Sequence, residues 1–142
     1  MNQDQLHLSK ILRRTVHGQA QIQTILKTAI GTQLRKALLI QLKEYRIIEV
    51  QAHSLSSAKG WRLRNYDPFL QYLFRKLIKL RLGALQYDSN ATSYMMRNCM
   101  NGIIDTLTVL HHDANQISPI SLLARRLLDC ERSCIEQLQE FL

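Results

Sequence analysis

The chain has 142 residues, of which 46% are hydrophobic, and this size suits one compact domain over residues 1–142 and leaves little room for two. The chain holds 19 Lys and Arg against 11 Asp and Glu, and the resulting formal charge of +8 favours acidic partners. Five Gly and two Pro exclude collagen-like and Pro-rich designs, and are too few for the turns of a sandwich or barrel. We therefore predict an all-α fold.

The cellular setting is predicted from what the sequence lacks. No uncharged apolar run reaches the roughly 18 residues that cross a bilayer, and residues 1–10 have no apolar signal region. Three cysteines with no Cys-x-x-Cys pair predict neither a disulfide framework nor a closed zinc site. We expect a cytoplasmic protein whose cysteines are small buried residues on helix faces.

The first segment is predicted to be an amphipathic helix that ends before Gly31 and Thr32. Its inward positions recur at alternating steps of three and four residues: Leu8, Ile11, Thr15, Gly18, Ile22, Ile25 and Ala29. A glycine inside a helix costs roughly 1 kcal/mol of propensity. We interpret Gly18 as a point where two helices approach closely.

A second and a third helix are predicted from the same spacing. The second ends near Gly60, a suitable residue just beyond a helix, and its stripe is Leu34, Leu38, Gln41, Tyr45, Ile48, Ala52 and Leu55. The third is predicted from about Pro68 to Tyr87. Its stripe is Leu70, Leu73, Leu77, Leu80 and Ala84.

The last part of the chain is predicted to hold two more helical segments. The fourth follows a polar turn at 88–92 and is predicted to turn Met96, Cys99, Ile103, Leu107 and Leu110 inward. It fades near residues 111–115. Ser118 and Pro119 then match an N-cap followed by proline, and the fifth stripe is Leu123, Leu127, Cys130, Cys134, Leu138 and Phe141.

Short connections between helices of this length favour an antiparallel up-down four-helix bundle, because they force neighbours to run in opposite directions. Two arrangements of the last part stay open. Either the last long helix is broken near 115–119, or a short fifth helix packs beside the fourth.

The C-terminal part also carries a resemblance. The stretches 88–105 and 123–142, with a weaker match over 38–55, are similar to small uncharacterised ferritin-like helical-bundle proteins of Firmicutes. The resemblance implies a bacterial protein with a ferritin-like bundle, and it attaches no activity.

A metal centre is not predicted. A di-iron carboxylate bundle takes Glu-x-x-His from two helices, and this chain contains no such motif. The nearest pattern is Glu49 with His53, which share one helix face and can hold a single ion or form a surface pair. We predict no cofactor, and keep a divergent metal-carboxylate protein around Glu44, Glu49 and His53 as an alternative.

Catalytic signatures are missing from the sequence as well. There is no glycine-rich phosphate loop and no Gly-x-Ser-x-Gly elbow, and the five histidines are scattered. We therefore predict a protein that is not an enzyme and that has no identified small-molecule substrate.

The most unusual feature is the charge between residues 59 and 81, which hold seven bases and one acid with aromatic residues interleaved. Cations neutralise phosphates and aromatics stack on bases, as a nucleic-acid surface requires. The candidate residues for nucleic acid or another anionic surface are Arg62, Arg64, Arg75, Lys76 and Lys79. A basic amphipathic helix also suits a membrane surface or a partner helix, and a solvated bundle face explains the charge better than either kind of binding.

We predict that the protein acts by binding a protein partner or by forming a homodimer. Binding to nucleic acid or an anionic surface through residues 59–81 is the first alternative, ahead of a membrane surface. The metal-carboxylate hypothesis is the second.

Overall fold

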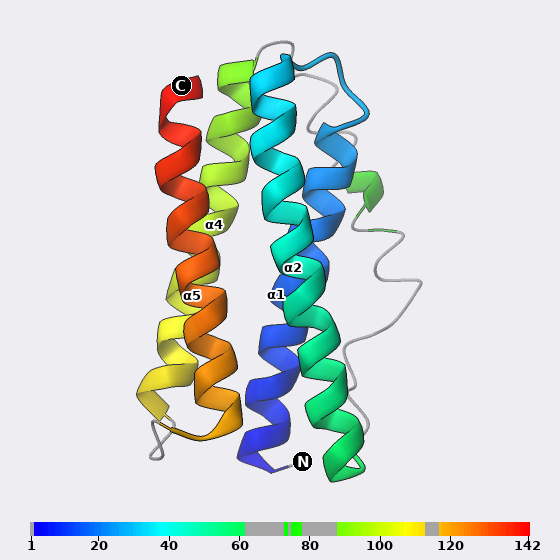
Figure 1. Cartoon of the computed structure of the whole chain (residues 1–142), viewed down its shortest axis with the longest axis vertical. Helices are drawn as coiled ribbons and strands as arrows, with labels where there is room; N and C mark the ends of the chain where they lie inside the picture. The colour runs from blue at the N-terminus through cyan, green and yellow to red at the C-terminus, as the bar shows by residue number, and fades with distance from the viewer. Residues whose placement is uncertain (1, 62–72, 74, 78–87, 113–116) are drawn as a thin grey trace.

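The computed structural model of the protein describes residues 2–61, 73, 75–77, 88–112 and 117–142 (Figure 1). The long helices are α1 (Gln3–Ile25), α2 (Thr32–Lys59), α4 (Asp88–His112) and α5 (Pro119–Leu138), and a short 3₁₀ turn, η1 (Gln139–Phe141), follows α5. The predicted all-α fold is confirmed. No helix within the described ranges is long and apolar enough to pass through a bilayer.

The helices form a closed ring in which α1 contacts α2, α2 contacts α5, α5 contacts α4, and α4 contacts α1. Figure 1 shows the paired helices running in opposite directions, as the short connections predict. The backbone N–H of Gly31, at the start of α2, donates to both carboxylate oxygens of Asp88 at 3.0 and 3.2 Å. The first residues of α2 and α4 therefore lie at the same end of the bundle. Because α4 and α5 lie side by side, the fifth segment is a separate helix.

The helix ends follow local signals in the sequence. Asn2 begins α1 with a capping box, Ser118 caps α5 ahead of Pro119, and Gly60 ends α2 in the left-handed region at φ 68°. The predicted end of α1 is wrong by several residues. The Thr28 backbone N–H and hydroxyl both donate to the Ile25 carbonyl, at 2.9 and 2.6 Å, and this turn closes the helix early.

The predicted inner faces of α1, α2 and α5 are largely confirmed. All their stripe residues are buried except Ala29, which lies beyond the end of α1, and Leu55 and Phe141, which are half-buried. Gly18 lies under the fully buried ring of Tyr45, and a Cβ at position 18 would lie 2.5 Å from Tyr45 Cε2. The close approach predicted at Gly18 is therefore to a side chain of α2.

The predicted inner face of α4 is wrong at every position except Cys99, which is fully buried as predicted. Leu107 is exposed, and Met96, Ile103 and Leu110 are only half-buried. The inward positions are instead small or polar in several places: Ala91, Thr92, Met95, Asn98, Cys99, Gly102, Thr106 and Val109. The helix is rotated from the predicted orientation because charged side chains of α1 and α5 meet it inside the bundle, as described below.

The predicted third stripe is also wrong at the two positions that the structure describes. Leu73 and Leu77 are 41% and 58% exposed. The physical reason is that α1, α2, α4 and α5 already close the core among themselves. Leu70, Leu80 and Ala84 lie outside the described residues.

Candidate functional site

A buried ion pair crosses the middle of the bundle. Glu131 of α5 is completely buried, and its Oε1 lies 3.9 Å from Nη2 of Arg14 on α1. The Tyr45 hydroxyl of α2 donates to Glu131 Oε2 at 2.7 Å. Three helices thus converge on one carboxylate, and this explains why a charged residue is tolerated in the core.

The fourth helix completes this buried polar layer. Arg14 Nη2 donates to the backbone oxygen of Asn98 at 2.8 Å and to its side-chain Oδ1 at 3.0 Å. One turn later, a Cβ at Gly102 would lie 2.5 Å from Glu131 Oε1 and 2.8 Å from Arg14 Nη2. The space beside the ion pair therefore suits a glycine. Helix α4 turns Asn98 and Gly102 inward because the charged pair requires a polar partner and room.

The electrostatics of this layer reflect its burial. Burial raises the pKa of Glu131, an effect that Arg14 and the hydrogen bond from Tyr45 oppose. Burial also raises the pKa of Tyr45, and the carboxylate of Glu131 adds to that effect. Tyr45 therefore stays protonated and holds Glu131 as a hydrogen-bond donor.

The three cysteines lie next to this layer and are free and buried, as predicted. The contact with Cys134 and burial raise the pKa of the Cys99 thiol, and burial raises that of Cys130. Gln41 Nε2 lies 3.0 Å from Cys130 Sγ and donates to the Cys130 carbonyl oxygen at 3.2 Å. The Cys99 and Cys130 thiols are therefore protonated core groups and not activated nucleophiles.

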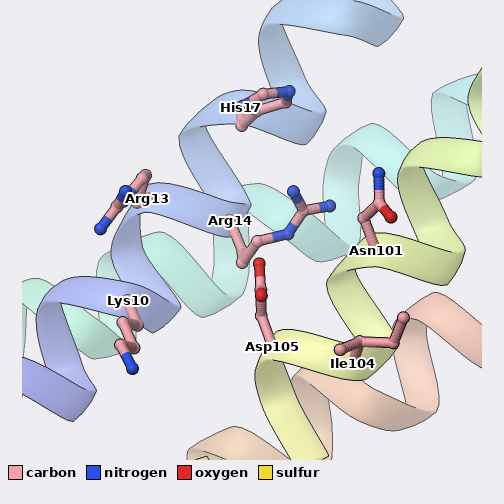
Figure 2. A pocket seen from close by; sticks show the side chains of 7 residues that line it. All are labelled: Lys10, Arg13, Arg14, His17, Asn101, Ile104 and Asp105. Carbon is pink, nitrogen blue, oxygen red and sulfur yellow. The ribbon is translucent and has the colours of Figure 1, made fainter. Parts of the chain in front are cut away.

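Arg14 also lines a surface cavity of about 510 Å³ between α1 and α4. Figure 2 shows Arg14 extending from α1 toward α4, with the Asp105 carboxylate pointing toward it. Lys10 and Arg13 lie farther out along α1, and His17 lies one turn beyond Arg14. We call this cavity the α1/α4 hollow.

The α1/α4 hollow is an electropositive environment. The pKa of His17 is lowered from 6.5 to about 4, first by burial and then by the charges of Arg14 and Arg13. The imidazole is therefore neutral at pH 7. Among the described residues, neither Lys10 nor Arg13 has a carboxylate oxygen within salt-bridge distance.

The solvent side of α4 carries three large apolar residues. Met100, Ile104 and Leu107 are 57%, 62% and 43% exposed, and they follow one another at steps of four and three residues. Such steps place them on one helix face. We call these three residues the α4 stripe.

Of the residues named for a metal site, Glu49 and His53 lie together as a pair on α2, whereas Glu44 does not join them. His53 Nε2 lies 3.8 Å from Glu49 Oε1, and Gln19 of α1 donates to the other Glu49 oxygen. Glu44 instead faces α5, where Arg126 Nε donates to it at 2.7 Å. Within the described ranges, no group of three or more His, Cys, Asp or Glu is placed to hold a metal ion.

The basic candidates fall mostly beyond what the structure describes. Arg75 and Lys76 are exposed. Arg62, Arg64 and Lys79 lie outside the described residues. The described part of this segment therefore places two of the five predicted anion-binding residues on the surface.

Sequence reasoning missed the buried polar layer and the α1/α4 hollow. A signal for them is present, because Arg14 lies four residues before Gly18 and Glu131 lies four residues after Leu127, both at inward spacing. A charged residue on the inner stripe of each of two helices indicates a buried pair. The hollow leaves a similar signal, since Lys10, Arg13, Arg14 and His17 share one face of α1.

The chain was compared with known proteins in three ways. No protein-family model matches it, and no curated protein is similar to it in sequence. Among solved structures, the chain resembles the crystal structure of a DUF305 fragment from Deinococcus radiodurans with a TM-score of 0.74. The two share 14% sequence identity, over 99% of this chain and 95% of the other. The chain is thus an all-α protein with a DUF305-like helical fold, and at this identity the likeness concerns the fold alone.

Proposed function

We propose that the protein acts by association, without chemistry of its own, and that a second copy of the chain packs on the α4 stripe. The observation that carries the proposal is the orientation of α4. This helix exposes Met100, Ile104 and Leu107 while it buries Asn98 and Gly102.

An exposed apolar stripe on a helix costs free energy in water unless it is covered. The other helices expose large apolar residues too, such as Val50 on α2 and Leu122 on α5, but α4 aligns three of them at helical spacing. Side chains at steps of four and three residues form the seam through which two helices pack. A twofold pair of α4 helices covers the same stripe on both copies at once.

The mass of the protein in solution tests this proposal. Sedimentation equilibrium is measured near physiological salt, where the charge of +8 opposes association less strongly than in low salt. We expect a dimer for the natural chain and a monomer for Ile104→Glu, because two carboxylates then meet at the centre of the seam.

Val50→Glu on α2 is the matched control. Val50 is 65% exposed, which is close to the 62% of Ile104, and it lies outside the α4 stripe. We expect this variant to stay dimeric. A natural chain that is monomeric at all accessible concentrations, or equal losses in the two variants, would overturn the proposal.

A further inference from the structure

We propose that the α1/α4 hollow binds a small oxyanion, a molecule that carries a phosphate or carboxylate group. The inference goes beyond association through the α4 stripe, because it depends on cationic residues of α1. The class of ligand is inferred from the charge of the residues that line the hollow and from the volume of the hollow.

The first argument is the convergence of the bases. Lys10, Arg13, Arg14 and His17 lie within an arc of about 100° on α1, since each residue advances the helix by about 100°. All four line the hollow. On the wall contributed by α4, Asn101 adds an amide, and Asp105 is the acid that lines the same space. Three permanent cations and one carboxylate thus line the hollow, and one of the cations, Arg14, is also paired with the buried Glu131.

The second argument is the state of Arg14. Arg14 is only 8% exposed, and its Nη2 already donates hydrogen bonds to the backbone and side-chain oxygens of Asn98. Its Nε is buried and makes no hydrogen bond to the described residues, although Arg14 lines the hollow. A buried donor without a partner costs about 1–3 kcal/mol, so an acceptor that reaches the Arg14 Nε gains a hydrogen bond. An oxyanion is the acceptor that a guanidinium binds best.

The third argument concerns the size of the ligand. The hollow of about 510 Å³ lies within the range of about 300–1,000 Å³ that is usual for small-molecule sites. Its innermost cation is nearly buried between two helices. A small molecule can approach this cation more closely than the backbone of a rigid duplex can, so the burial of Arg14 favours a small molecule over a nucleic acid.

The test is a titration of the full chain with inorganic phosphate, followed by isothermal calorimetry and by the NMR signals of the His17 ring. Chloride keeps the ionic strength constant, because screening alone changes the affinity of any cationic surface. We expect one saturable site per chain. We also expect the pKa of His17 to rise from about 4 on binding, since a nearby anion favours the charged imidazole. Acetate, titrated in the same way, distinguishes a carboxylate from a phosphate source.

The double variant Lys10→Gln with Arg13→Gln keeps the buried ion pair and removes two cations from the rim. Its phosphate affinity is expected to fall about tenfold or more, given the usual strength of charged hydrogen bonds. The matched control is Lys43→Gln with Arg46→Gln on α2, which removes two exposed bases at the same spacing. The control is expected to bind phosphate as the natural chain does.

Three results would overturn the proposal. They are phosphate binding without saturation, equal loss of affinity in the two double variants, and binding of an oligonucleotide by a chain that does not bind phosphate. The last result would indicate a nucleic-acid surface elsewhere on the protein.

Discussion

Helices α4 and α5 pack against each other, yet they distribute their large apolar side chains differently between the core and the surface. Helix α5 buries Leu123, Leu127 and Leu138. Helix α4 buries Asn98 and Gly102 together with Met95 and Val109, and it leaves Met100, Ile104 and Leu107 on the outside. The difference teaches that the inner face of a helix is set by its neighbours' side chains as much as by its own hydrophobicity.

The cause lies in one charged pair. Arg14 and Glu131 bring a cation and a carboxylate into the core, and both need polar partners and space. Helix α4 supplies the two Asn98 oxygens as hydrogen-bond acceptors, and Gly102, which has no side chain, leaves space for the pair. Once these residues face inward, Met100 and Ile104 must face outward. The buried layer and the α4 stripe are therefore two sides of one helix orientation.

The largest expected effect is on the free energy of unfolding, and it appears when one leucine of α5 and one of α4 are each replaced by alanine. Leu127 of α5 is fully buried, whereas Leu107 of α4 is 43% exposed. Leu127→Ala is expected to lower the free energy of unfolding by about 2–5 kcal/mol, and Leu107→Ala by about 0.5 kcal/mol. Urea unfolding is measured in an Ile104→Glu background, so that association does not contribute. Equal losses would mean that α4 is not rotated as described.

The next prediction breaks the charged pair. Arg14→Met leaves Glu131 buried without its cation, and we expect a loss of about 3 kcal/mol of unfolding free energy. Arg13→Met, at the exposed neighbouring position, is expected to change it by about 0.5 kcal/mol or less. Adding Glu131→Gln to Arg14→Met removes the unpaired charge and keeps an acceptor for Tyr45, so it should restore most of the stability. A double variant no more stable than the single one would argue against a stabilising pair.

The smallest expected effect is a pH dependence from the α1/α4 hollow. The folded pKa of His17 is about 4 against an ordinary 6.5, so the unfolded chain binds more protons between these values. This histidine therefore contributes stability above pH 6.5, which is lost as the pH falls toward 4. Glu131, whose folded pKa is raised, acts in the opposite direction, and its contribution is common to the proteins compared.

Chemical unfolding of the natural chain and of His17→Gln across this pH range isolates the histidine. The natural chain is expected to lose more stability on acidification than the variant. His112→Gln, which removes an exposed histidine at the end of α4, is the control and should follow the natural chain. Parallel pH profiles for the natural chain and His17→Gln would show that His17 is not held neutral by its surroundings.

Much of the fold was predictable because local signals agree with the packing. The spacing of apolar residues identifies the inner faces of α1, α2 and α5, and the caps at Gly60 and Ser118 fall where they were predicted. Local spacing failed for α4, where the inward residues were decided by Arg14 and Glu131, which are distant in the sequence. The buried polar layer was missed for the same reason, because its residues are distant from one another in the sequence. Arg14 gains its role only beside Asn98, a partner 84 residues away.

Cross-linking at the centre of the α4 stripe tests the central claim most directly. Ile104→Cys is compared with Val50→Cys under mild oxidation at low protein concentration, and the three natural cysteines stay silent because they are buried. If two copies pack through α4, Ile104→Cys forms a disulfide-linked dimer rapidly and Val50→Cys does not. Equal cross-linking of both variants, or a dimer by mass in which Ile104→Cys does not cross-link, would contradict the claim.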